Sequence, residues 1–78
     1  MKVRYFATLR DLSGMEEEDF FVQETSSVEK VYSELKARHP AFSSQKNVLF
    51  ALNERFVDPQ TKVSNDDVLA IFPPVSGG

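Results

Sequence analysis

Apolar side chains recur along the chain with two different periods, and the period separates strands from a helix. In residues 2–6 (KVRYF) polar and apolar side chains alternate, which is typical of a strand with one face on a core. The helical spacing i, i+3, i+4, i+7 appears instead at Val28, Val31, Tyr32 and Leu35. Further strands are predicted at residues 19–23 (DFFVQ), 48–52 (VLFAL), 55–57 (RFV) and 68–72 (VLAIF).

The residues that flank the helical stripe predict where the helix begins and ends. Ser26 and Glu29 have the spacing of a capping box, in which the serine oxygen accepts from the third helical N–H and the glutamate reaches back. Pro40 disfavours a helical conformation at His39, so the helix should end there. We therefore expect His39 to interact with the exposed carbonyls of the helix C-terminus and not to act as a catalytic base.

Turn-forming residues separate the remaining elements. Residues 8–14 (TLRDLSG) predict a short helical turn closed by Gly14, and residues 41–47 predict a polar loop. The three adjacent glutamates at 16–18 predict a solvated loop. Asn53-Glu54 suits a tight turn between two strands.

These elements follow one another as strand, strand, helix and three further strands. Because the first two strands can form a hairpin and the chain then crosses over through a helix, the order predicts an α+β fold. The sheet should be mixed and curled, with four to five strands packed on one main helix and with the first and last strands parallel at its centre. We expect one domain over residues 1–72 and an extended tail over residues 73–78.

Alternation in the first and last strands places two aromatic residues on the outer face of the sheet. If Leu69 and Ile71 cover the helix, Phe72 points to the opposite face and lies beside Phe6. A small protein gains little from two exposed rings, so they predict a surface that binds a partner protein. The alternative is a loop that folds over both rings.

Composition excludes several kinds of chemistry. The 78 residues contain no cysteine and one histidine, which excludes disulfides, thiolate zinc sites and multi-histidine metal sites, so no metal is expected. A net charge of −3 argues against nucleic-acid binding. No apolar run approaches the roughly 18 residues of a membrane span, and no signal-peptide pattern is present, so the sequence predicts a cytoplasmic protein without membrane contact.

The end of the sequence combines a stiff spacer with residues that lack side chains. The tail consists of Pro73, Pro74, Val75, Ser76, Gly77 and Gly78. The two prolines lack backbone donors, so sheet pairing should stop and the chain should continue extended for about 20 Å. A lone Gly-Gly would indicate a frayed end. Here the two glycines follow the proline spacer and Phe72, and this combination predicts a tail that enters a narrow channel and delivers a carboxylate.

Three segments carry a resemblance to a known family. They are residues 5–14 (YFATLRDLSG), 51–54 (ALNE) and, most specifically, 72–78 (FPPVSGG). In these segments the chain resembles the ubiquitin-like sulfur carriers of the β-grasp fold, and most closely the small subunit of molybdopterin synthase. The likeness extends over nearly the whole chain. One departure lies at residues 65–67 (NDD), where the family often has glycine next to aspartate, and it concerns turn geometry.

The resemblance implies a function in molybdenum cofactor biosynthesis. An E1-like enzyme would adenylate Gly78 with ATP, and a sulfur-donor enzyme would convert the acyl-adenylate into a thiocarboxylate. In the active site of the large synthase subunit this sulfur would attack cyclic pyranopterin monophosphate to form molybdopterin. The implied assembly has two small and two large subunits. The chain would be a non-catalytic sulfur-donor subunit without a bound cofactor.

The resemblance also suggests which side chains contact the partners. Phe6, Phe56 and Phe72 are the candidates for the hydrophobic contact with the activating enzyme and the large subunit. Arg10 is predicted either to make a polar contact at the rim or to be a solvated surface arginine.

Three other functions remain open from the sequence. The chain could carry sulfur for thiamine synthesis or tRNA thiolation, or it could be a ubiquitin-like modifier that is conjugated to lysines. It could also be an interaction domain in which Gly77-Gly78 is incidental.

Overall fold

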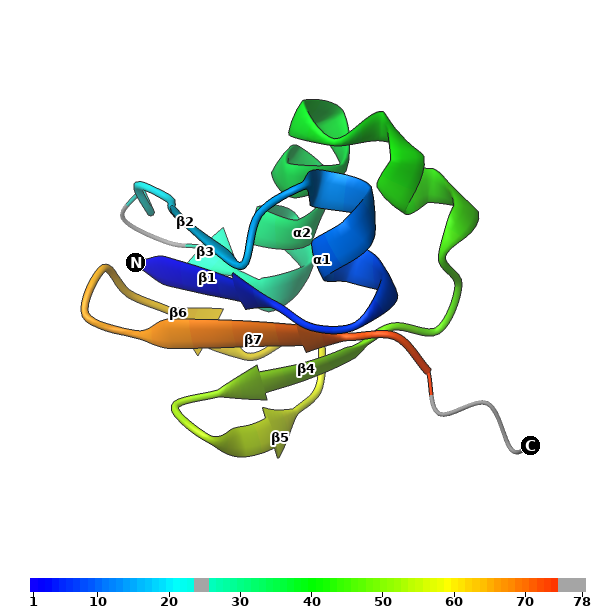
Figure 1. Cartoon of the computed structure of the whole chain (residues 1–78). Helices are drawn as coiled ribbons and strands as arrows, with labels where there is room; N and C mark the ends of the chain where they lie inside the picture. The colour runs from blue at the N-terminus through cyan, green and yellow to red at the C-terminus, as the bar shows by residue number, and fades with distance from the viewer. Residues whose placement is uncertain (24–25, 75–78) are drawn as a thin grey trace.

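A computed structural model describes residues 1–23 and 26–74 (Figure 1). Its elements are β1 (Lys2–Tyr5), α1 (Thr8–Ser13), β2 (Glu17–Asp19), β3 (Ser26–Ser27), α2 (Val28–Arg38), the 3-10 helix η1 (Pro40–Ser44), β4 (Leu49–Leu52), β5 (Arg55–Val57), β6 (Lys62–Val63) and β7 (Val68–Phe72). Within the described residues, five strands form one sheet in the order β2-β1-β7-β4-β5, and β3 and β6 form a second, two-stranded sheet.

The central strands β1 and β7 run parallel, and all other neighbours in the large sheet are antiparallel. The helix α2 packs on one face of this sheet, as the ribbon shows (Figure 1). This arrangement confirms the predicted α+β fold, with a mixed sheet, one main helix, and the first and last strands together at the centre.

Alternating side chains of the central strands form the core, as the sequence predicts. Val3, Leu69 and Ile71 are 0% exposed, and Tyr5 is 2% exposed. The stripe of α2 packs against them, because the residues Val28, Val31, Tyr32 and Leu35 are all buried in the same cluster. The residues that alternate with them along the strands point to the opposite face of the sheet.

The ends of α2 differ slightly from the prediction. The N-cap is Ser27, whose Oγ accepts the N–H of Lys30 at 3.2 Å, so the prediction of Ser26 as the cap is wrong by one residue. Ser26 pairs with Val63 in the small sheet instead. The C-cap is His39, as expected, and its N–H donates to the carbonyl of Leu35 at 2.8 Å.

The predicted second strand is wrong in position. The strand β2 uses residues 17–19 of the acidic segment, while the structure assigns no strand to residues 20–23. Phe20 and Val22 are nevertheless buried, each at 4% exposure. The backbone of Val22 pairs with the side-chain amide of Asn65 at 2.7 and 2.9 Å, so a side chain replaces a neighbouring strand there. The acidic segment forms a strand by pairing with β1, and Nζ of Lys2 lies 2.7 Å from a carboxylate oxygen of Glu17 across that pair.

The predicted loop at residues 41–47 is in part a 3-10 helix. Pro40 begins this turn, and Phe42 within it is 0% exposed. Its ring contacts Tyr5 edge-on, with ring centroids 5.2 Å apart. Phe42 is thus part of the core, although the other residues of the segment are mostly polar and exposed.

Two predicted turns are confirmed. Gly14 ends α1 with a φ of 74°, a left-handed conformation that favours glycine. Asn53 and Glu54 connect β4 to β5, and both have positive φ, as a two-residue type I′ turn requires. In the part of the chain that the structure describes, no helix is long and apolar enough to cross a membrane.

Candidate partner-binding surface

Three phenylalanines gather on the face of the sheet opposite α2. The rings of Phe6 and Phe72 stack, with centroids 4.5 Å apart and planes 13° from parallel. The ring of Phe56 lies 5.8 Å from that of Phe72 and is tilted by 49°. Phe56 is 71% exposed. Together with Leu49, which is 39% exposed, these residues form what we call the aromatic surface.

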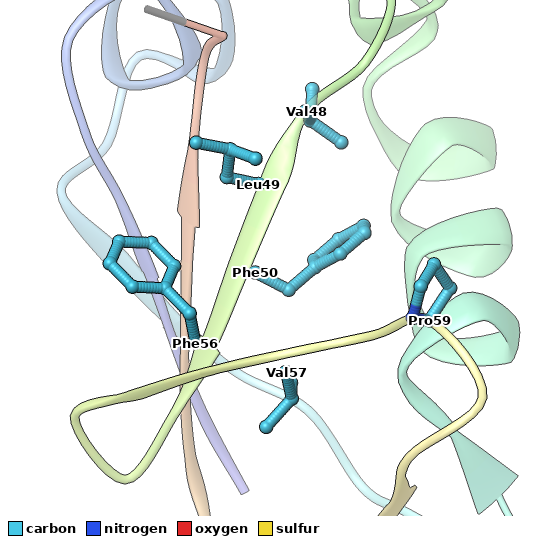
Figure 2. Close-up of a pocket in the computed structure, with 6 residues that line it drawn as sticks. All are labelled: Val48, Leu49, Phe50, Phe56, Val57 and Pro59. Atoms are coloured by element: carbon cyan, nitrogen blue, oxygen red, sulfur yellow. The ribbon is translucent and has the colours of Figure 1, made fainter.

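Strand register explains how this surface is assembled. Phe72 is the last residue of β7 and lies opposite Leu49 of β4, and Phe56 lies opposite Ala51. Leu49 and Ala51 are two residues apart, so both point to the outer face, where Figure 2 shows Leu49 and Phe56 on the same side of β4. The predicted alternation is confirmed. Leu49 was not among the predicted contacts, although its place opposite Phe72 makes it part of the surface.

A sharp turn of the backbone places Phe6 beside Phe72. The N–H of Phe6 donates to the carbonyl of Ile71 at 3.2 Å, which continues the pairing of β1 with β7 by one residue. Ala7 then has a φ of 51° and a ψ of −125°, a conformation that residues with a Cβ rarely adopt. Its carbonyl accepts the N–H of Arg10 at 3.0 Å and begins α1. The chain therefore leaves the sheet directly after the aromatic ring.

Two arginines border the aromatic surface on the side of β1. The guanidinium carbon of Arg4 lies 5.5 Å from the ring centre of Phe6. Arg10 lines the same small hollow as Phe6, with a volume of about 100 Å³, and its Nη1 lies 3.7 Å from Glu16. The side chain of Arg10 is 51% exposed, so the weak ion pair leaves it accessible. This position agrees with a rim contact, which remains a prediction.

The aromatic surface leads directly into the proline spacer. Phe72 is the last paired residue of β7, and neither Pro73 nor Pro74 belongs to a strand, as the missing donors predict. Pro73 is half-buried and Pro74 is exposed. The other predicted tail residues, Val75, Ser76, Gly77 and Gly78, lie outside the described residues.

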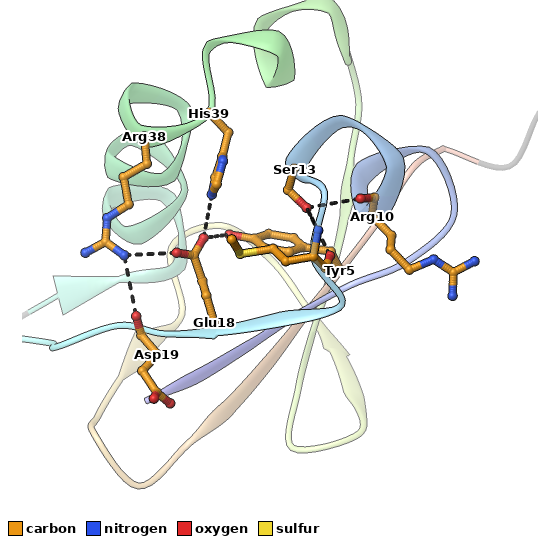
Figure 3. Close-up of polar contacts among 8 residues, drawn as sticks. Tyr5, Arg10, Ser13, Glu18, Asp19, Arg38 and His39 are labelled. Carbon is orange, nitrogen blue, oxygen red and sulfur yellow. Dashed lines mark hydrogen bonds and ion pairs between the residues drawn. The ribbon is translucent and has the colours of Figure 1, made fainter.

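On the helix side of the sheet, a cluster of polar side chains converges on Glu18 (Figure 3). The Tyr5 hydroxyl donates to Oε1 of Glu18, and Nε2 of His39 lies 2.7 Å from the same oxygen. Nη1 of Arg38 donates to Oε2 at 3.2 Å. Two predictions are corrected here, because the acidic segment is not fully solvated and the His39 ring contacts a carboxylate and not the carbonyls of the helix end.

The surroundings of Glu18 favour its ionised form. Burial alone would raise the pKa of this carboxyl, but hydrogen bonds from Tyr5 and His39 outweigh burial and lower it. Burial, together with the hydrogen bond to Glu18, raises the pKa of the Tyr5 hydroxyl. The cluster connects β1, β2 and the end of α2 on the helix side of the sheet, so it stabilises the fold. Within residues 1–23 and 26–74, no group of three His, Cys, Asp or Glu side chains is placed to hold a metal ion.

Comparison with known proteins agrees with this geometry. The sheet order and the single main helix define a ubiquitin-like protein of the β-grasp fold. The model of the ThiS family matches residues 3–78, and the chain belongs to this family.

Individual relatives match over almost their full length. The chain is 40% identical over 81 residues to a molybdopterin synthase sulfur carrier subunit of Chlamydomonas reinhardtii, covering 100% of this chain and 98% of that protein. A solved structure described as molybdopterin converting factor subunit 1 of Pyrococcus furiosus has a TM-score of 0.86 at 34% identity and covers 95% of both chains. SAMP1 of Haloferax volcanii has a TM-score of 0.87 at 26% identity and covers 100% of this chain and 98% of its own. The resemblance inferred from the FPPVSGG ending is thereby confirmed.

Proposed function

We propose that the chain is the sulfur carrier subunit of molybdopterin synthase and acts in molybdenum cofactor biosynthesis. The observation that carries this proposal is the aromatic surface, which lies at the root of the FPPVSGG segment and leads into it. Relatives named for this role support the proposal, since one is 40% identical over the whole chain. We propose that residues 1–72 form the binding domain and that residues 73–78 form the tail that it presents.

The carboxylate of Gly78 has to be activated before it can accept sulfur. A terminal carboxyl has a pKa of about 3.5, so it is ionised at neutral pH and is a poor electrophile. In the proposed first step, a carboxylate oxygen attacks the α-phosphate of ATP, which gives an acyl-adenylate and releases pyrophosphate. Sulfide that a donor enzyme supplies as HS⁻ then attacks the carbonyl carbon and displaces AMP, and loss of the S–H proton leaves a thiocarboxylate.

Transfer of the sulfur to the pterin returns Gly78 to its carboxylate form. The thiocarboxylate sulfur attacks a carbon of cyclic pyranopterin monophosphate, the carbon–oxygen bond at that carbon breaks as the carbon–sulfur bond forms, and substrate and carrier are then joined through a thioester. Water cleaves the thioester, which leaves sulfur on the pterin and restores the carboxylate of Gly78. Two carriers supply the two sulfur atoms of molybdopterin. Since Gly77 and Gly78 have no Cβ, the approach to the carbonyl is unobstructed.

Catalytic acids, bases and phosphate-binding groups belong to the partners in this proposal. The partners are an E1-like adenylating enzyme, a sulfur-donor enzyme and the large synthase subunit, in a heterotetramer of two small and two large subunits. Phe6, Phe56 and Phe72 make the hydrophobic contact, and Arg10 contacts the polar rim. Pro73, Pro74, Val75 and Ser76 contact the partner as the tail enters its channel. We place the protein in the cytoplasm, where it needs no cofactor of its own.

The alternative functions find less support. A carrier for thiamine or tRNA thiolation and a protein modifier share the fold, but curated relatives that are 40% and 34% identical are named as molybdopterin synthase subunits. The fate of Gly78 separates the possibilities, because a modifier yields conjugates of higher mass whereas a sulfur carrier yields a small pterin product.

Reconstitution with the activating enzyme, a sulfur donor and the large subunit tests the proposal. Deletion of Gly77-Gly78 should abolish molybdopterin formation while the truncated chain still binds the large subunit through the aromatic surface. The matched control is Phe21→Ala, because Phe21 is 75% exposed and follows β2 at the opposite edge of the sheet from β5. Product formation by the truncated chain would refute the carrier function.

A further inference from the structure

An apolar hollow opens at the β4–β5 edge of the sheet, next to the aromatic surface (Figure 2). Its volume is about 330 Å³, and it is lined by Val48, Leu49, Phe50, Phe56, Val57 and Pro59. All six of these residues are apolar. A hollow of this size has room for one large apolar side chain.

The hollow exists because β5 ends at Val57, so the first residue of β4, Leu49, has no partner in β5. The last pair between the two strands is Phe50 with Val57. Beyond it the chain turns at Asp58, whose carboxylate accepts the N–H of Gln60 at 2.8 Å. The carbonyl of Pro59 then accepts the N–H of Glu29 at 2.9 Å, which fixes the proline against the start of α2. Both walls are therefore held by the fold, and the space between them is preformed.

We infer that this hollow receives an apolar side chain that projects from the partner protein covering the aromatic surface. The inference rests on the proposed function and adds a second, deeper contact to the proposed interface. Phe56 and Leu49 belong to both features, so a partner that covers the aromatic surface also covers the mouth of the hollow. The two contacts are continuous.

The lining indicates a macromolecular occupant and not a small ligand. Sites for metabolites combine apolar walls with a few polar groups that orient the ligand, and the six lining side chains provide none. A side chain delivered by a partner needs no such group, because the rest of the interface orients it. Apolar anchors that fill preformed pockets dominate the affinity of protein interfaces.

Filling the hollow from inside tests the inference. Val48→Phe places a ring in the hollow and leaves Phe6, Phe56 and Phe72 in place. Val57→Thr keeps the shape of the wall but adds a hydroxyl to it. Each variant is titrated calorimetrically against the large subunit of molybdopterin synthase from the same organism, with thermal unfolding as a check on folding and with Phe21→Ala as the matched control.

We expect both variants to remain folded at the temperature of the titration and to weaken binding about tenfold or more, with wild-type affinity for Phe21→Ala. Wild-type affinity in both folded variants would overturn the inference and leave the proposed function standing. If the wild-type chain itself does not bind the large subunit, the proposed function fails, and the inference fails with it.

If Val48→Phe instead abolishes a dimer of the isolated chain while partner affinity is unchanged, the occupant is a second copy and the inference is wrong. Should Val48→Phe unfold the chain, Val57→Thr decides.

Discussion

The two faces of the β1–β7 pair have the same backbone and opposite environments. On the helix side, Leu69 and Ile71 are 0% exposed and pack under α2. On the outer side, Phe72 follows directly after Ile71, yet its ring stacks on that of Phe6 and lies 5.8 Å from the tilted ring of Phe56. Neighbouring residues of one strand thus lie in the core and on the surface that we propose binds the partner, because strand alternation sends them to different sides.

This separation means that stability and binding can be altered independently. A change on the helix side removes core packing and lowers the free energy of unfolding. If the proposed interface is correct, a change on the outer side removes contact area with the partner and leaves the core intact. Variants of adjacent residues therefore test the comparison between the two faces directly.

Ile71→Ala should have the largest effect, and on stability alone. Removing a fully buried isoleucine leaves a cavity, and such changes cost about 2–5 kcal/mol of unfolding free energy. Urea denaturation of the variant measures this loss. Below its unfolding midpoint the variant should still bind the large subunit with near wild-type affinity. A variant as stable as the wild type would show that Ile71 does not face the core.

Phe72→Asp should reverse this pattern. The charge disrupts an apolar contact, so binding to the large subunit should weaken by about 2 kcal/mol or more, which is roughly 30-fold. The loss of stacking on Phe6 should cost no more than about 1.5 kcal/mol of stability. Calorimetric titration and thermal unfolding of the same sample measure both effects. A large loss of stability with unchanged affinity would contradict the assignment of Phe72 to the outer face.

Glu18→Gln should have the smallest effect, again on stability only. The carboxylate accepts from Tyr5 and Arg38 and contacts His39, and 15% of its side chain is exposed, so we expect a loss of about 1–2 kcal/mol at pH 7. Since the folded-state pKa of Glu18 lies below its ordinary value of 4.5, its contribution is present above pH 4.5 and is lost as the pH falls through the lowered pKa.

Thermal unfolding of wild type and Glu18→Gln between pH 7 and pH 3 measures this dependence. The difference in stability between the two proteins should shrink on acidification, because the wild-type carboxylate becomes protonated. Glu17 and Asp67 also have lowered pKa values, but they are present in both proteins and cancel in the difference. A difference that stays constant with pH would contradict the role of the ionised Glu18.

The fold was predictable where the information is local. Alternation in residues 68–72 predicts β7 with its observed bounds, and the apolar stripe predicts α2. The position of β2 depends on contacts from elsewhere in the chain, since Glu17 becomes a strand residue through pairing with Arg4 and an ion pair with Lys2. The burial of Phe42 likewise depends on Tyr5, which is distant in sequence.

The candidate site was predictable for a similar reason. Side chains alternate between the two faces along β1 and β7, and because these strands are neighbours, Phe6 and Phe72 meet on the same face. The hollow beside Phe56 was not predictable, since it depends on where β5 diverges from β4 and on the hydrogen bond between Pro59 and Glu29. The contact of His39 with Glu18 required the fold for the same reason, as the two residues are far apart in sequence.

The intact mass of the chain tests the sulfur-carrier function most directly. The purified protein is incubated with its activating enzyme, ATP and a sulfur donor, and is then measured by mass spectrometry. Conversion of the Gly78 carboxylate to a thiocarboxylate predicts an increase equal to the mass difference between one sulfur and one oxygen atom, and this increase should require ATP. An unchanged mass in the presence of all components would contradict the account.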